Sequence, residues 1–138
     1  MKLTNEIIRE IVENLDIGFR CFVNRESGEL ISIPNENNYS NFEPEMWQNE
    51  LITIKKSRKK LTEIEGMSTT DSLRVMEQFI ASVQEKKLKE RLLQAIHRHK
   101  PFAHFKLEID NSGTERDRWF EFKKQRLIEW VRNQIDLS

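Results

Sequence analysis

The chain has only one cysteine, Cys21, among its 138 residues. A single cysteine excludes an internal disulfide framework and any zinc site with several cysteine ligands. The amino-terminal stretch MKLTNEIIRE carries Glu6 and Glu10 where a secretory signal would need an uninterrupted apolar segment. We therefore expect a reducing, cytoplasmic location. Because Cys21 lies in an alternating strand pattern, we interpret it as a small buried core residue and not as a nucleophile.

Glycine is scarce as well, with four residues, and the glycine-rich phosphate-binding motifs are absent. The catalytic patterns G-x-S-x-G and H-E-x-x-H do not occur either. No apolar run is long enough to span a bilayer. We therefore expect no cofactor and no membrane partner, assign no catalytic residue, and favour a protein that is not an enzyme.

The chain also lacks net charge, since 23 basic residues balance 23 acidic ones. This balance argues against a protein whose main role is to coat nucleic acid, although a local basic patch remains compatible with it. Eight phenylalanines and three tryptophans supply bulk for a core, so the composition is that of a folded protein. The length fits one domain over residues 1–138.

The hydrophobic periodicity predicts a mostly helical α+β domain in which an amino-terminal β-hairpin packs against helices. The hairpin covers 19–33, with Gly28 in its turn. The segment LTEIE at 61–65 alternates and is compatible with a third short strand or with a continued helix. Ser68 and Asp71 form a capping-box pattern before a helix. We expect helices at 4–15, 44–60, 69–84, 86–98, 101–110 and 114–135, and a loop at 35–42.

Three apolar side chains fall away from the faces that we assign to the core. Phe22 and Leu30 lie on the otherwise polar face of the hairpin. In the last helix, a helical wheel places Trp119, Phe120 and Trp130 in the apolar half but Phe122 in the polar half. Phe22 and Leu30 indicate that another element covers this face of the hairpin. Phe122 either covers a loop or is an exposed anchor for a partner, and we favour the structural role, because single exposed apolar residues are common. We retain Phe22, Leu30 and Phe122 as candidate partner-binding residues.

Arg116 projects into the apolar half of the same helix. It covers Trp119 or Phe120 as a cation–π partner, or it pairs with a carboxylate such as Asp110 or Glu108, or it binds a partner. We favour the internal role and retain Arg116 as a candidate partner-binding residue.

The segment KKSRKK is the densest basic run in the chain. Its cations are a candidate nucleic-acid site, because cations neutralise phosphates; the structural alternative is an ordinary solvated helix surface. These cations are Lys55, Lys56, Arg58, Lys59 and Lys60.

Histidines cluster further along the chain, at His97, His99 and His104, and Glu108 follows His104 at helical spacing. His104 and Glu108 are weak candidates for a metal or catalytic site. We expect no metal, because Pro101 divides the segment and because residues two apart on a helix point away from each other.

Four stretches occur in an order that resembles an uncharacterised family of bacterial proteins. They are the cap at Ser68, MEQF at 76–79, FAHFK at 102–106 and RWFEFK at 118–123, and the hairpin with Ser27, Gly28 and Glu29 in its turn is similar too. Pro101 departs from the family pattern, so the junction after His99 is expected to differ. The resemblance implies one bacterial intracellular domain and brings no established activity.

These observations favour a small, non-catalytic interaction or regulatory domain, whose partner is an unknown protein or a second copy of the chain. The first alternative is a nucleic-acid-binding protein that uses the basic run at 55–60. The second is an enzyme or metal protein that uses the His and Glu cluster at 97–108.

Overall fold

The computed structural model describes residues 3–136, and these residues divide into two compact units. One unit contains the chain up to Gly66 together with the segment from Leu127 onwards, and the other is Met67–Arg126. The fold is α+β and mostly helical, as predicted. The division into units does not test whether residues 1–138 form one domain, so that expectation stays a prediction.

The first unit is built on a three-stranded antiparallel sheet in the order β2-β1-β3. Its strands are β1 (Phe19–Asn24), β2 (Leu30–Pro34) and β3 (Leu61–Ile64). Gly28 has a φ of 75° in the turn between β1 and β2, a conformation that glycine adopts without steric cost. The third strand confirms the extended reading of LTEIE.

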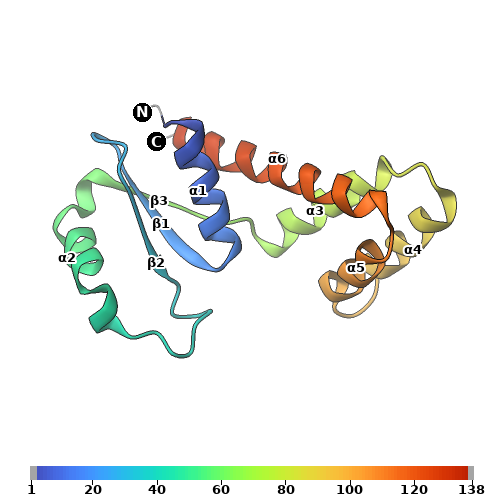
Figure 1. Cartoon of the computed structure of the whole chain (residues 1–138), viewed down its shortest axis with the longest axis horizontal. Helices are drawn as coiled ribbons and strands as arrows, with labels where there is room; N and C mark the ends of the chain where they lie inside the picture. Colours follow the sequence, from blue (N-terminus) through green and yellow to red (C-terminus); the bar gives the residue numbers. More distant parts are fainter. Residues whose placement is uncertain (1–2, 137–138) are drawn as a thin grey trace. The chain divides into compact units, whose positions relative to one another are not determined.

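Helices cover both faces of this sheet, as Figure 1 shows for α1 (Asn5–Asp16) and α2 (Gln48–Lys56). The α1 face is lined by Cys21, Val23 and Ile64, and it also packs against Val131 and Ile135 near the end of α6 (Thr114–Asp136). The α2 face is lined by the strand residues whose side chains point away from α1. They are Phe22, Ile31, Ile33 and Leu61.

The register of the hairpin corrects one expectation. Phe22 pairs with Ile31 and Val23 pairs with Leu30, so Phe22 and Leu30 lie on opposite faces of the sheet. Each is covered by a helix of its own: Phe22 belongs to the α2 face, and Leu30 packs on the α1 face. The placement of Phe22 and Leu30 on the same face of the hairpin was therefore a wrong prediction.

The predicted helix at 44–60 is interrupted in the structure. A 3-10 turn, η1 (Pro44–Trp47), leads into α2, and a second one, η2 (Arg58–Lys60), follows a break at Ser57. The break follows from strand pairing, because the backbone N–H of Arg25 donates to Lys60 O at 2.8 Å at the start of the β1–β3 ladder. The backbone must leave the helix before this pairing begins.

The second unit is a helical assembly around an aromatic core. It contains α3 (Thr69–Ala81), α4 (Lys86–Ile96), α5 (Pro101–Asp110) and the part of α6 up to Arg126. Trp119 is central to this core, since its ring lies 5.2 Å from Phe79 and 4.8 Å from Phe105 between centroids. Pro101 opens α5 directly after Lys100, whose φ of 55° turns the chain sharply.

The side-chain cap predicted at Ser68 is present: Ser68 accepts the backbone N–H of Asp71 at 3.1 Å. Thr4 caps α1 in the same way and accepts the backbone N–H of Ile7 at 3.2 Å. Among residues 3–136 there is no helix that combines the length and the apolar character needed to cross a membrane.

Candidate functional site

Of the apolar residues proposed as partner contacts, none has the exposure that this role needs. Phe22 is 7% exposed, and Leu30 is only partly buried but packs against the α1 core. Phe122 packs against the core of the second unit, with its ring 5.5 Å from that of Phe79. These three side chains contribute to packing and do not form a free surface.

The helical wheel was wrong about the two phenylalanines of α6. Phe120, which it placed in the apolar half, is 44% exposed, whereas Phe122 packs inward beside Trp119. The wheel assigned Trp119 and Trp130 to one apolar half, although the two residues contribute to different units. Trp119 is buried in the second unit, whereas Trp130 is only half-buried and donates to Glu65 O at 2.8 Å in the first. Because two different cores contact α6 in turn, one wheel cannot describe the whole helix.

Arg116 has the internal role that the sequence favoured. Its guanidinium lies 4.7 Å from the ring centroid of Phe120, and its Nε is 3.3 Å from Asp110 Oδ1. A hydrogen bond from Lys106, assisted by Arg116, lowers the pKa of the Asp110 carboxyl below its ordinary value. Arg116 therefore joins the start of α6 to the end of α5, within the second unit.

The basic run forms an exposed corner of the first unit, at the end of α2 and in η2. Lys55, Lys56, Arg58, Lys59 and Lys60 are all exposed, and Lys60 lies 3.5 Å from Glu26. The guanidinium of Arg25 binds the backbone beside them, donating to Lys59 O and, at 2.8 Å, to Leu61 O. We call these five residues the basic corner.

The histidine segment does not come together as a metal site. Glu108 is 3.2 Å from Arg91 Nε, and the ring Nδ1 of His97 is 2.7 Å from Leu93 O. Over the described range 3–136, no group of three or more His, Cys, Asp or Glu side chains is placed to hold a metal ion. The arrangement therefore gives no support to His104 and Glu108 as ligands.

Cys21 is fully buried on the α1 face of the sheet, as the strand pattern predicted. Its thiol lies 3.5 Å from the hydroxyl of Ser32, which also accepts from Asn14 Nδ2 at 3.0 Å. Burial raises the pKa of the Cys21 thiol above its ordinary value, and the Ser32 hydroxyl opposes this effect in part. A buried neutral thiol is a poor nucleophile, because the thiolate is the reactive form.

The outer edge of β2 is the feature that sequence reasoning missed. Antiparallel ladders alternate between bonded and non-bonded pairs. The ladder is fixed at both ends of β2: Asn24 N–H donates to Glu29 O at 2.9 Å, and Asn35 N–H donates to Gly18 O at 3.1 Å. By this alternation, the backbone N–H and C=O groups of Ile31 and Ile33 point toward β1. Those of Leu30 and Ser32 point outward.

Leu30 and Ser32 therefore present backbone N–H and C=O groups at the free edge of the sheet. Pro34, the last residue of β2, is buried and has no N–H to offer. No backbone group from the described residues, 3–136, bonds to these edge positions. The edge is consequently available for another strand.

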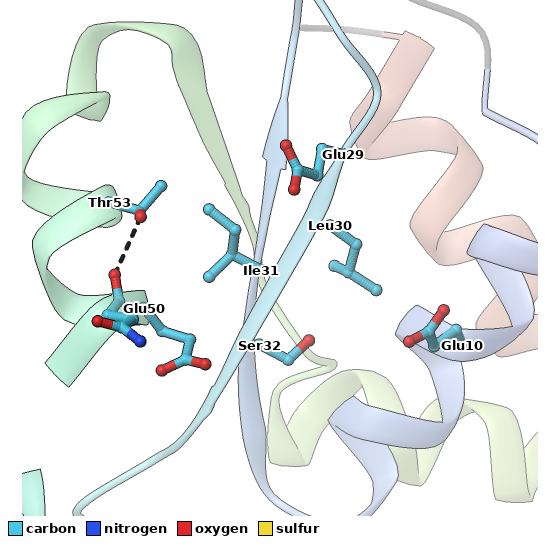
Figure 2. Close-up of a pocket in the computed structure, with 8 residues that line it drawn as sticks. Glu10, Glu29, Leu30, Ile31, Ser32, Glu50 and Thr53 are labelled. Carbon is cyan, nitrogen blue, oxygen red and sulfur yellow. Dashed lines mark hydrogen bonds between the residues drawn. The ribbon is translucent and has the colours of Figure 1, made fainter. Parts of the chain in front are cut away.

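An open pocket of about 400 Å³ lies along this edge. Figure 2 shows its two sides: Glu50 and Thr53 of α2 lie on one side of β2, and Glu10 of α1 lies on the other. Glu29 stands before the strand, and Leu30, Ile31 and Ser32 of β2 line the pocket between the helices. Among the described residues, 3–136, the lining contains carboxylates but no lysine or arginine. We call these residues, together with Asn49, the β2-edge groove.

Two signals in the sequence bear on this groove. Both parities of the hairpin carry apolar residues, which indicates a sheet covered on both faces, and Pro34 is typical of an edge strand. The sequence gives no such signal for the acidic lining, because Glu10 and Glu50 belong to different helices and come together only in the tertiary fold.

Comparison with known proteins places the chain in a family. A family model described as "Uncharacterised protein family (UPF0158)" matches residues 2–137. A protein of Pseudomonas aeruginosa, described as UPF0158 protein PA5073, is 30% identical over 77 residues, which are 56% of this chain and 50% of the relative. This match spans half the length of the relative. No solved structure matches the chain. Since the family model covers nearly every residue, the chain belongs to the uncharacterised protein family UPF0158.

Proposed function

We propose that this chain is a small non-catalytic protein-interaction domain, and that an extended segment of its partner adds to β2 as a further strand. The observation that carries the proposal is the outward alternation of backbone groups at Leu30 and Ser32 along an open groove. Strand addition to a sheet edge is a recurrent mode of peptide recognition, in which main-chain hydrogen bonds supply affinity.

The free energy expected from the backbone hydrogen bonds of an added strand is that of a reversible complex. Each backbone hydrogen bond contributes about 0.5–1.5 kcal/mol net, because the groups exchange water for a protein partner. β2 is short and ends at Pro34, and both features limit uncontrolled pairing of sheet edges. The groove therefore supports binding of modest affinity.

Proline substitution provides a test that is specific for the edge. Ser32→Pro removes the outward N–H and places a ring in the path of the incoming strand, whereas Ser32→Ala removes the hydroxyl and keeps the N–H. We expect Ser32→Ala to retain binding of blocked peptides of about six residues, the length of a typical strand, and Ser32→Pro to lose it.

The peptides form a panel of cationic, neutral and anionic sequences on a common threonine and valine background, measured by fluorescence anisotropy. Circular dichroism of both variants checks that the fold is retained. If no member of the panel binds the wild-type chain, or if the two variants bind equally, strand addition at β2 is rejected.

A second candidate function is nucleic-acid contact at the basic corner, and it is supported by the exposure of all five cations beside a backbone held by Arg25. Replacement of Lys55, Lys56 and Lys59 by glutamine is expected to weaken binding of a short DNA duplex at low salt and to flatten its salt dependence. Equal binding by the wild type and the variant would dismiss this candidate.

For the setting of the domain we propose a reducing, cytoplasmic compartment, supported by the single cysteine, Cys21.

A further inference from the structure

We propose that the segment recognised by the β2-edge groove is basic, with lysine or arginine on both faces of the added strand. This inference rests on the proposed function and gives it a partner chemistry. It starts from the charged side chains among the described residues that line the groove, which are all carboxylates.

Carboxylates flank the edge on both sides of the sheet. Glu10 rises from α1 on the side of Leu30 and Ser32, and Glu50 rises from α2 on the side of Ile31 (Figure 2). Glu29 lies at the start of the strand. Within residues 3–136, none of these three carboxylates forms a salt bridge. They are therefore available to pair with the charges of a ligand.

The geometry of a strand determines at which positions of the bound segment cations can reach these carboxylates. Successive side chains of a strand point to opposite faces of the sheet. In a segment bonded to Leu30 and Ser32, residues of one parity would lie on the α1 side near Glu10. Residues of the other parity would lie on the α2 side near Glu50. A segment with cations at two neighbouring positions can pair with both Glu10 and Glu50. A segment with a cation at every second position can pair with only one of them.

The negative charge of the groove also disfavours two other possible ligands of this edge, a second copy of the chain and a nucleic acid. A second copy of this chain paired edge to edge would bring two sets of Glu10 and Glu50 to one seam, and like charges that face each other across strands destabilise the pairing. The phosphates of a nucleic acid would meet the same repulsion. A basic peptide is the occupant whose charge is complementary to the groove.

The test compares peptides of different charge on variants of the groove. The panel contains a peptide with neighbouring lysines, its neutral counterpart with glutamines and its anionic counterpart with glutamates. The variants are Glu10→Gln, Glu50→Gln and the double variant. Glu77→Gln is the matched control, because Glu77 is exposed on α3 in the other unit and loses the same charge.

We expect the lysine peptide to bind most tightly. Each groove substitution should weaken it by about two- to fivefold, the range for a solvent-exposed ion pair, and the double variant should lose more. Glu77→Gln should bind as the wild type does. Added salt should reduce the difference between the lysine and glutamine peptides, because ions screen exposed charges.

Equal binding of the lysine, glutamine and glutamate peptides would overturn the charge proposal and leave strand addition in place. Failure of all three peptides to bind would remove the proposed function itself. Light scattering gives an independent result: a dimer of the wild type that Ser32→Pro dissociates would assign the edge to a second copy, and the basic-peptide proposal would be wrong.

Discussion

At the scale of single residues, Phe120 and Phe122 make a sharp comparison, because two neighbouring phenylalanines of α6 have different surroundings. Phe122 contacts the ring of Phe79 and faces Trp119, whereas Phe120 is exposed, with the guanidinium of Arg116 above its ring. Aromatic packing of this kind contributes to stability beyond the burial of area.

We predict that Phe122→Ala lowers the free energy of unfolding by about 2 kcal/mol or more, and that Phe120→Ala lowers it by less than about 1 kcal/mol. Urea denaturation followed by circular dichroism measures both values under the same conditions. A larger loss for Phe120→Ala would restore the helical-wheel assignment and contradict the observed packing.

The buried thiol of Cys21 predicts a pH dependence. Burial raises its pKa in the folded state, so the unfolded chain releases the thiol proton first as the pH increases. The contribution of this group is complete below the unfolded thiol pKa of about 8.5, and it is lost as the pH rises further. The free energy of unfolding should therefore fall more between neutral pH and about pH 10 in the wild type than in Cys21→Ala.

Urea denaturation of both proteins at the two pH values measures this difference. The alanine variant is the control, because only the loss of stability that depends on the Cys21 thiol differs between the two proteins. Parallel losses in the two proteins would show that Cys21 has no such linkage.

At the scale of elements, the cap of α3 is a feature that could be read from the sequence and that has a measurable cost. Ser68 accepts the N–H of Asp71, and its hydroxyl lies 2.7 Å from Asp71 Oδ2. We predict that Ser68→Ala lowers the free energy of unfolding by about 1 kcal/mol, since it leaves a backbone donor at the helix start without its partner.

Thr70→Ala is the matched control for this cap. Thr70 is exposed two residues further along α3 and has a hydroxyl of similar chemistry. Thermal denaturation of the two variants gives the comparison. Equal midpoints would mean that the cap at Ser68 contributes nothing to stability.

Local patterns were sufficient for most elements. The spacing of apolar residues predicted α1, α3, α4, α5 and α6 to within a few residues, and the turn at Gly28 fixed the hairpin. The helix at 44–60 was too long, because pairing between Arg25 and Lys60 overrides the local helical preference. Tertiary contacts of this kind are not visible in the spacing of residues along one segment.

At the scale of the whole molecule, the chain has two units with separate cores, and this division explains which site residues were misplaced. Phe122 was placed in the polar half of the helix because the wheel treated α6 as facing one core, whereas its two parts belong to different units. The β2-edge groove could not be predicted, since Glu10, Ser32 and Glu50 lie in three separate elements. Their approach depends on how the helices cover the sheet.

Strand addition requires that Leu30 and Ser32 hold free outward backbone groups that a strand can use. Amide hydrogen exchange, followed residue by residue by NMR, measures whether these groups are free. We predict that in the free protein the amides of Leu30 and Ser32 exchange faster than those of Ile31 and Ile33, and that the lysine peptide slows exchange at Leu30 and Ser32 selectively. Equal protection along β2 in the free protein, or no change at these two amides when the peptide binds, would contradict the account.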